Sequence, residues 1–133
     1  MLNNVIKVEK IVASNLLAER IPLNKVREES SNVWTEIKIF APASVEDATK
    51  VANKVDIHEV KMVLRLQPCE DLNPGVYAFR LTTADGKRYM LGMNERPYPV
   101  ITCQDVHPDK VANAQGKTVT VAYNGLFGLV EIV

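Results

Sequence analysis

The sequence predicts a mainly β fold, namely a small antiparallel β-sandwich or barrel of about seven or eight strands with at most one or two short helices. Three observations lead to this prediction. Short segments alternate between polar and apolar residues, β-branched residues are frequent in them, and turn-forming pairs such as Asp85-Gly86 and Asn124-Gly125 separate them. No linker or internal repeat divides the chain, so residues 1–133 are expected to form a single β-rich domain.

The clearest strand is predicted at 59–66. Val60, Met62, Leu64 and Leu66 fall on one face there, and Lys61 and Arg65 fall on the other, a pattern typical of a strand with one buried face. Less complete versions of the same pattern predict strands at 5–12, 34–40, 76–83, 88–92, 100–103 and 118–123.

Two tight hairpins are expected. Asp85-Gly86 is predicted to join the strands at 76–83 and 88–92, with positive φ at both residues, and Arg80 is expected to face outward. Asn124-Gly125 predicts a second turn, after which 126–133 returns as another strand.

The segment 44–55 fits two structures. Ser44 followed by Asp47 resembles a helix cap, and apolar residues recur at helical spacing from Val45 to Val55, which favours a helix. The segment is short and rich in valine, so a strand remains the alternative. The polar stretch 23–32 is expected to be a solvated loop, and 14–20 either a short helix or a continued strand.

Composition limits the function classes. The 133 residues are 47% hydrophobic and 24% charged, as in an ordinary soluble globular protein. The 16 basic and 16 acidic residues cancel, which disfavours nucleic-acid binding. No apolar stretch approaches the roughly 20 residues that cross a bilayer, and charges interrupt the first residues. We therefore expect no membrane segment or signal peptide, and a location in the cytoplasm or in a virion.

Few residues of the sequence indicate catalysis or metal binding. His58 has Asp56 and Glu59 nearby to orient it as a base, but a histidine at the end of a strand is usually a surface residue. Cys103 and His107 have a spacing found in parts of zinc sites, yet a structural zinc needs four ligands and no second pair is present. We expect no metal, no cofactor and no catalytic residues.

Acidic residues occur in adjacent pairs at Glu28-Glu29, Glu46-Asp47 and Glu70-Asp71. Paired carboxylates can hydrolyse glycosides when a fold holds them at a fixed separation. Adjacent residues of a strand point to opposite faces, so these pairs are expected to be solvated surface. No glycine-rich phosphate-binding loop is present either.

The segment 95–99 is the most unusual in the chain. A tyrosine between two prolines, Pro97-Tyr98-Pro99, is both rigid and amphipathic, which suits either a contact surface or a stiff cover over the core. Trp34, Arg96 and Tyr98 are the candidate residues for protein contact.

The order of the strand pair at 82–92 and the following Asn94-Glu95-Arg96-Pro97-Tyr98-Pro99 resembles small prophage-encoded virion proteins of the tail or its connector. This resemblance implies packing into a ring or tube through strand edges and loops, without catalysis. Our leading hypothesis is therefore a non-enzymatic structural or assembly subunit that works as a homo-oligomer or with protein partners. A sandwich or barrel module that binds a peptide, sugar or small molecule is the alternative, and a small enzyme using Cys103 and His107 ranks last.

Overall fold

Eleven strands and one three-residue 3-10 turn account for the regular structure of the residues that the computed structural model describes, which are 2–40, 43–67, 75–94, 96–106, 116–125 and 127–133. In chain order they are β1 (Leu2–Val12), η1 (Ala13–Asn15), β2 (Ala18–Ile21), β3 (Lys25–Glu28), β4 (Thr35–Ile37), β5 (Ala43–Ala52), β6 (Val55–Leu66), β7 (Tyr77–Thr83), β8 (Arg88–Leu91), β9 (Val100–Val106), β10 (Gly116–Gly125) and β11 (Val130–Ile132).

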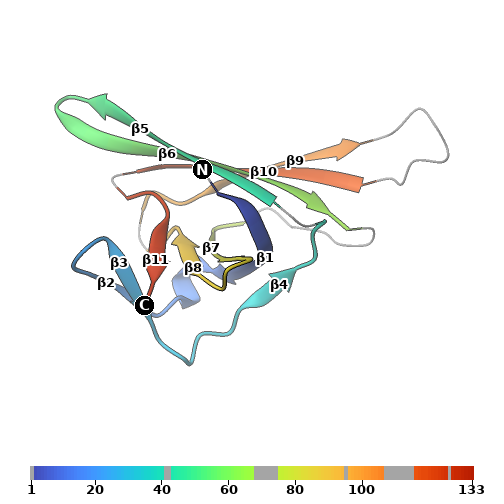
Figure 1. Cartoon of the computed structure of the whole chain (residues 1–133), viewed down its shortest axis with the longest axis horizontal. Coiled ribbons are helices and arrows are strands. Elements are labelled where there is room, and N and C mark those ends of the chain that lie inside the picture. The colour runs from blue at the N-terminus through green and yellow to red at the C-terminus, as the bar shows by residue number, and fades with distance from the viewer. Residues whose placement is uncertain (1, 41–42, 68–74, 95, 107–115, 126) are drawn as a thin grey trace.

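The strands form one sheet that curls on itself without closing (Figure 1). Its order is β2-β3-β11-β8-β7-β1-β5-β6-β10-β9, with β4 paired beside β1, and the β3–β11 pair is parallel. The prediction of a mainly β fold is confirmed. The finer prediction is not, because the sheet is an open half-barrel and its strands number about eleven rather than seven or eight.

The two strands β4 and β5 both lie beside β1, and they belong to different layers of the sheet (Figure 1). β1 pairs with β4 through Val8 and Ile37, and then with β5 through Val5 and Ala43. Ile39, between the two strands, forms a bridge to Leu66 of β6. One stretch of chain therefore contributes to both layers, as at the corner of an orthogonally packed sheet.

The core lies between the long strands β5, β6, β10 and the layer that contains β1, β7 and β8. Phe79, Leu81, Met62 and Leu64 are fully buried there. A second apolar cluster covers the other face of β7 and β8, where Ala78 is buried. Because both faces of β7 are covered, the expectation of an outward Arg80 is wrong: only 15% of its side chain is exposed.

The segment expected to be a helix, 44–55, is a β-hairpin instead. β5 pairs with β6 along its length, from Ser44 opposite Val63 to Ala52 opposite Val55. Asn53 and Lys54 form the turn, with φ of 50° and 64°. A helix would have to bury the whole valine stripe, whereas strand pairing buries Val45 and leaves Val51 68% exposed.

The hairpin expected at Asn124-Gly125 is absent. β10 continues through both residues, which pair with Glu59 and His58 of β6. The returning segment forms β11, but it pairs with β8 and β3 rather than with β10. The turn-forming pair is overridden because the long neighbouring strand β6 satisfies its backbone.

The hairpin of β7 and β8 is confirmed, with a different turn. Among the turn residues only Gly86 has positive φ, at 87°. The Thr83 N–H donates to the Lys87 carbonyl at 2.9 Å, so the loop has the geometry of a type I turn ending in a left-handed glycine. The Thr83 hydroxyl also donates to the Asp85 carboxylate.

Replacing Thr83 with valine should raise the pKa of Asp85 toward its ordinary value. The hydrogen bond from Thr83 lowers the pKa of this carboxyl, with smaller contributions from Lys87. A lowered pKa in the folded state stabilises the protein above the unfolded value of 3.8, and this contribution is lost as the pH falls through the folded pKa. An NMR titration of Asp85 in both proteins checks the shift; equal titration curves would contradict it.

The polar stretch expected to be a loop contains strand β3, which forms a hairpin with β2. Leu23 and Asn24 make the turn at φ of 70° and 55°. β3 ends at Glu28, whose side chain is only 10% exposed. The prediction of a fully solvated segment is therefore wrong at Glu28, because a cation from a distant strand lies beside it.

Candidate functional site

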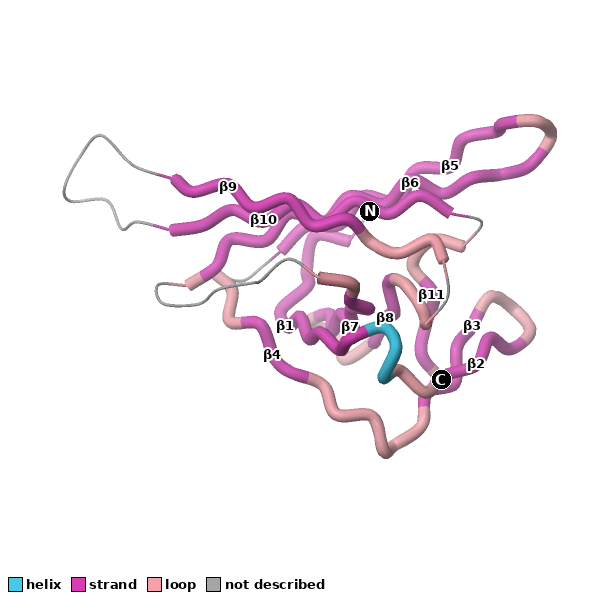
Figure 2. Tube along the Cα trace, turned by 180° about the vertical axis from the view of Figure 1, so that it is seen from behind, coloured by secondary structure: helices cyan, strands magenta, loops and turns pink. Residues whose placement is uncertain are grey.

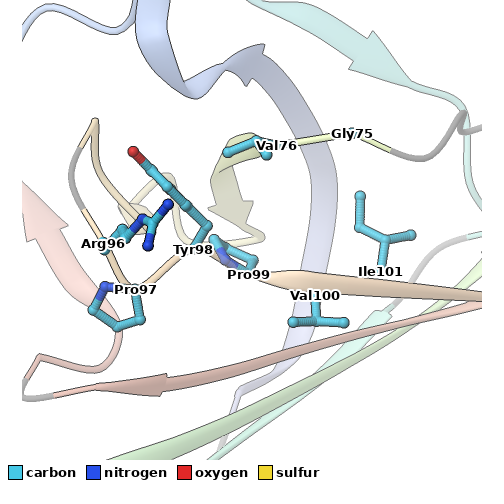
Figure 3. Close-up of a pocket in the computed structure, with 8 residues that line it drawn as sticks. All are labelled: Gly75, Val76, Arg96, Pro97, Tyr98, Pro99, Val100 and Ile101. Carbon is cyan, nitrogen blue, oxygen red and sulfur yellow. The ribbon is translucent and has the colours of Figure 1, made fainter.

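The Pro97–Pro99 segment forms one wall of an open groove, the Tyr98 groove, of about 660 Å³. Arg96, Pro97, Tyr98 and Pro99 lie on one side and continue into Val100 and Ile101 of β9. Gly75 and Val76, just before β7, lie on a facing segment (Figure 3). The lining is apolar apart from Arg96 and the Tyr98 hydroxyl.

Two glycines let this segment lie close to the sheet. Gly92 has a φ of 86°, and a Cβ there would lie 2.9 Å from the Pro99 ring. A Cβ at Gly125 would lie 3.0 Å from the ring of Pro97. Pro99 is buried and Tyr98 is half-buried, whereas Arg96 is exposed. The segment is therefore both a cover over the sheet and a surface that can be reached from solvent.

Exposed apolar side chains surround the groove. Val76 is 49% exposed and Val100 is 63% exposed. β9 is the last strand of the sheet, so its outer edge has no strand partner in the described part of the chain. An exposed edge beside an apolar groove is the arrangement by which sheets accept an additional strand, with backbone hydrogen bonds along the edge and side chains in the groove.

Trp34, the third predicted contact residue, lies in a different place. Its indole Nε1 donates to Glu28 Oε2 at 3.0 Å, and the Arg80 guanidinium lies 4.7 Å from the centre of its ring. Trp34 also packs against the second apolar cluster. The structure brings Arg96 and Tyr98 together and gives Trp34 a role in covering Arg80.

Arg80 is the centre of a charged cluster that the sequence did not indicate. Its Nε and Nη2 donate to both oxygens of Glu9, at 3.0 and 2.7 Å, and its Nη1 donates to Glu28 Oε1 at 2.7 Å. Arg88 Nη1 lies 3.5 Å from the same Glu28 oxygen. Burial opposes the charged form of Arg80, but the hydrogen bonds and charges of Glu9 and Glu28 outweigh it and raise its pKa.

A polar cavity of about 430 Å³ adjoins this cluster, lined by Glu9, Glu28, Arg80, Arg88 and Trp34 among others. Paired carboxylates in a cavity could serve acid–base chemistry. Here both carboxylates accept hydrogen bonds from Arg80, which holds them in place as its counterions. The arrangement is that of a structural ion pair with its donors and acceptors matched.

His58 pairs with Asp47 rather than with its sequence neighbours Asp56 and Glu59. The imidazole Nδ1 lies 3.0 Å from Asp47 Oδ1, across the β5–β6 hairpin. The other oxygen of Asp47 accepts the backbone N–H of Leu129 at 3.2 Å. The pair therefore ties the segment before β11 to the long hairpin. Recognising 43–66 as a hairpin with its turn at Asn53-Lys54 would have predicted the pair, because Asp47 and His58 then fall on one face at neighbouring positions.

Replacing Gly128 with alanine should destabilise the fold by about 1–3 kcal/mol, because the new Cβ would collide with the Asp47 carboxylate. Urea unfolding measures the loss. The same change made in an Asp47→Ala protein is the control, since the colliding group is then absent and the loss should be smaller. Equal losses in the two backgrounds would contradict this contact.

The remaining candidate residues, Cys103 and His107, lie outside the described side chains. His107 falls in a segment that the structure does not describe, and for Cys103 only its place in β9 is described. Among the described residues, no three His, Cys, Asp or Glu side chains gather in a way that could hold a metal ion. The described part of the chain likewise holds no helix long and apolar enough to cross a membrane.

Comparison of the chain with protein-family models, with curated protein sequences and with solved structures finds no match.

Proposed function

We propose that this chain is a non-enzymatic structural or assembly subunit that associates with itself or with protein partners through strand edges and loops. A component of a prophage tail or connector, working in the cytoplasm or in a virion, is the role that we propose on the resemblance of the 82–99 segment. The observation that carries the assembly proposal is the outer part of the β5–β6 hairpin.

Residues 50–57, which we call the free ribbon, are the outer part of this hairpin. Within the described chain, the two strands pair there only with each other. β1 pairs with β5 only at Ala43 and Val45, and β10 pairs with β6 only as far as His58. Figures 1 and 2 show this hairpin extending beyond the rest of the sheet, on the side opposite to the β9–β10 hairpin. A two-stranded ribbon is marginally stable by itself in water.

The composition of the free ribbon supports a partner. Val51 is 68% exposed and Val55 is 45% exposed, and they lie on opposite faces of the ribbon because Val51 pairs with Asp56 and Val55 with Ala52. Exposed β-branched residues on an unpaired edge form a template for another chain. The outer edges of β2 and β9 offer further templates at the two ends of the sheet.

Light scattering behind size exclusion, over a wide range of concentration, tests the proposal, with negative-stain images of any large species. A discrete oligomer, a polymer or a complex with another protein supports it. The proposal is contradicted if the purified chain stays monomeric at high concentration and also elutes as a monomer from extracts of the cells that naturally produce it.

The Tyr98 groove favours a second candidate, a module that binds a peptide, sugar or small molecule. Its apolar lining and the exposed Arg96 would fix such a ligand. A thermal-shift screen separates this candidate from the first, because a ligand that binds only the folded form raises Tm. A screen without any shift, combined with concentration-dependent assembly, would leave the assembly role.

A further inference from the structure

The inner face of the free ribbon presents one apolar and one acidic side chain side by side. Val45 and Met62 are directly paired and fully buried, which defines the inner face of the hairpin. Side chains alternate between the two faces of a strand. Val51 of β5 and Asp56 of β6, also directly paired, therefore lie on this same face, and both are exposed.

The Tyr98 groove presents the complementary pair. Pro97, Tyr98 and Val100 give it an apolar lining, and Arg96 lies beside them (Figure 3). Arg96 forms no ion pair with any part of the chain that the structure describes, and within the same limits Asp56 forms none either. Among the described residues, this exposed cation and this exposed anion thus have no ion-pair partner, and each lies next to exposed apolar surface.

The groove and the root of the ribbon are neighbours. Gly125 pairs with His58, the residue at which the ribbon leaves the sheet, and Pro97 lies against the inner face of Gly125. The root of the ribbon and the groove therefore lie close together on the same side of the sheet, and the two together are called the ribbon–groove surface. A second molecule that meets this surface can engage both parts of it.

We propose that a second copy of this chain occupies this surface, with Val51 of one ribbon in the Tyr98 groove of the other molecule and Asp56 on its Arg96. This inference rests on the proposed assembly function and names the partner and the contact. Asp56 and Arg96 carry opposite charges, and Val51 is apolar like the lining of the groove. The open edge of β9 lies beside the groove, where it can pair with backbone groups of the incoming ribbon. The contact covers the exposed valine of a ribbon that has no neighbouring strand outside its own hairpin in the described part of the chain.

Charge reversal tests the contact. Asp56→Arg and Arg96→Asp should each weaken self-association at least about tenfold, measured as the concentration at which the mass by light scattering falls to that of the monomer. The double variant restores opposite charges at the contact, so its association should return to within a few fold of the original. Val51→Asp, which places a charge in the apolar groove, should weaken association as strongly.

Lys7→Glu is the matched control. Lys7 is an exposed cation on β1, opposite Thr82 of β7, and β1 has strand neighbours on both sides. Because Lys7 lies outside the groove, the ribbon and the sheet edges, its reversal should leave association unchanged. Circular dichroism and urea unfolding of every variant show that the fold is retained.

Three outcomes would overturn the inference. The unmodified chain could be monomeric at every concentration, the two single reversals could leave its association unchanged, or the double variant could associate no better than the singles. A monomer in this experiment leaves the proposed assembly function standing, because that function is contradicted only if the chain is also monomeric in extracts of its own cells.

Discussion

Replacing Arg80 with methionine is expected to lower the free energy of unfolding by about 3–5 kcal/mol. The change keeps the apolar stem of the side chain and removes the charge. Glu9, which is 7% exposed, would then lose both of its hydrogen bonds to the guanidinium, and Glu28 would lose one. Two carboxylates would remain in a mostly buried site without their main counterion.

Urea unfolding at neutral pH measures this loss. Arg27→Met is the matched control, because Arg27 also pairs with a glutamate, at 3.4 Å, but both side chains are about two-thirds exposed. Arg27→Met should lower the free energy of unfolding by less than about 1 kcal/mol. If both variants lost the same free energy, burial of the Arg80 cluster would have no energetic importance. Should Arg80→Met fail to fold, the milder Arg80→Lys, which cannot form the two-pronged contact with Glu9, provides the measurement.

Replacing Phe79 with alanine should lower the free energy of unfolding by about 3–5 kcal/mol. Phe79 is fully buried in the main core, opposite Leu91 on β8, and its ring lies 6.4 Å from that of Tyr77. Alanine would leave a cavity among strands that are held by backbone pairing on both sides of β7, so the neighbouring side chains can fill only part of it.

Phe40→Ala is the control for this second prediction. Phe40 is 43% exposed and is not among the buried residues of either cluster. Its loss should be about 1 kcal/mol. Thermal unfolding by calorimetry compares the two variants, and a loss at Phe79 as small as that at Phe40 would contradict the assignment of the core.

Strands with one buried face could be predicted from the sequence. Segments whose apolar residues fit the spacing of a helix and also that of a strand could not. The alternation at 59–66 identifies β6, and Asp85-Gly86 places the β7–β8 turn correctly even though its dihedral angles differ. The valines of 44–55 satisfy the spacing of a helix as well as that of a strand. Pairing with β6 decides between the two, and this tertiary contact overrides local preference.

The candidate sites show the same limit. Tyr98 between its prolines could be singled out from local sequence, but the facing wall at Val76 comes from another part of the chain. Arg80 is separated by 71 residues from Glu9 and by 52 from Glu28. No local sequence pattern predicts an ion pair between residues so far apart in the chain, and the sequence therefore predicts an outward Arg80.

The parallel pairing of β11 with β3 has a consequence for the order of events during synthesis. β2 and β3 leave the ribosome early, yet β11, at residues 130–132, is the strand that connects them to β8. Until those residues emerge, the β2–β3 hairpin cannot pair with the rest of the sheet, and Ile132 cannot pack against Val26. Folding of this half of the molecule is therefore expected to wait until β11 has left the ribosome, and the nascent chain has to be kept from aggregating until then.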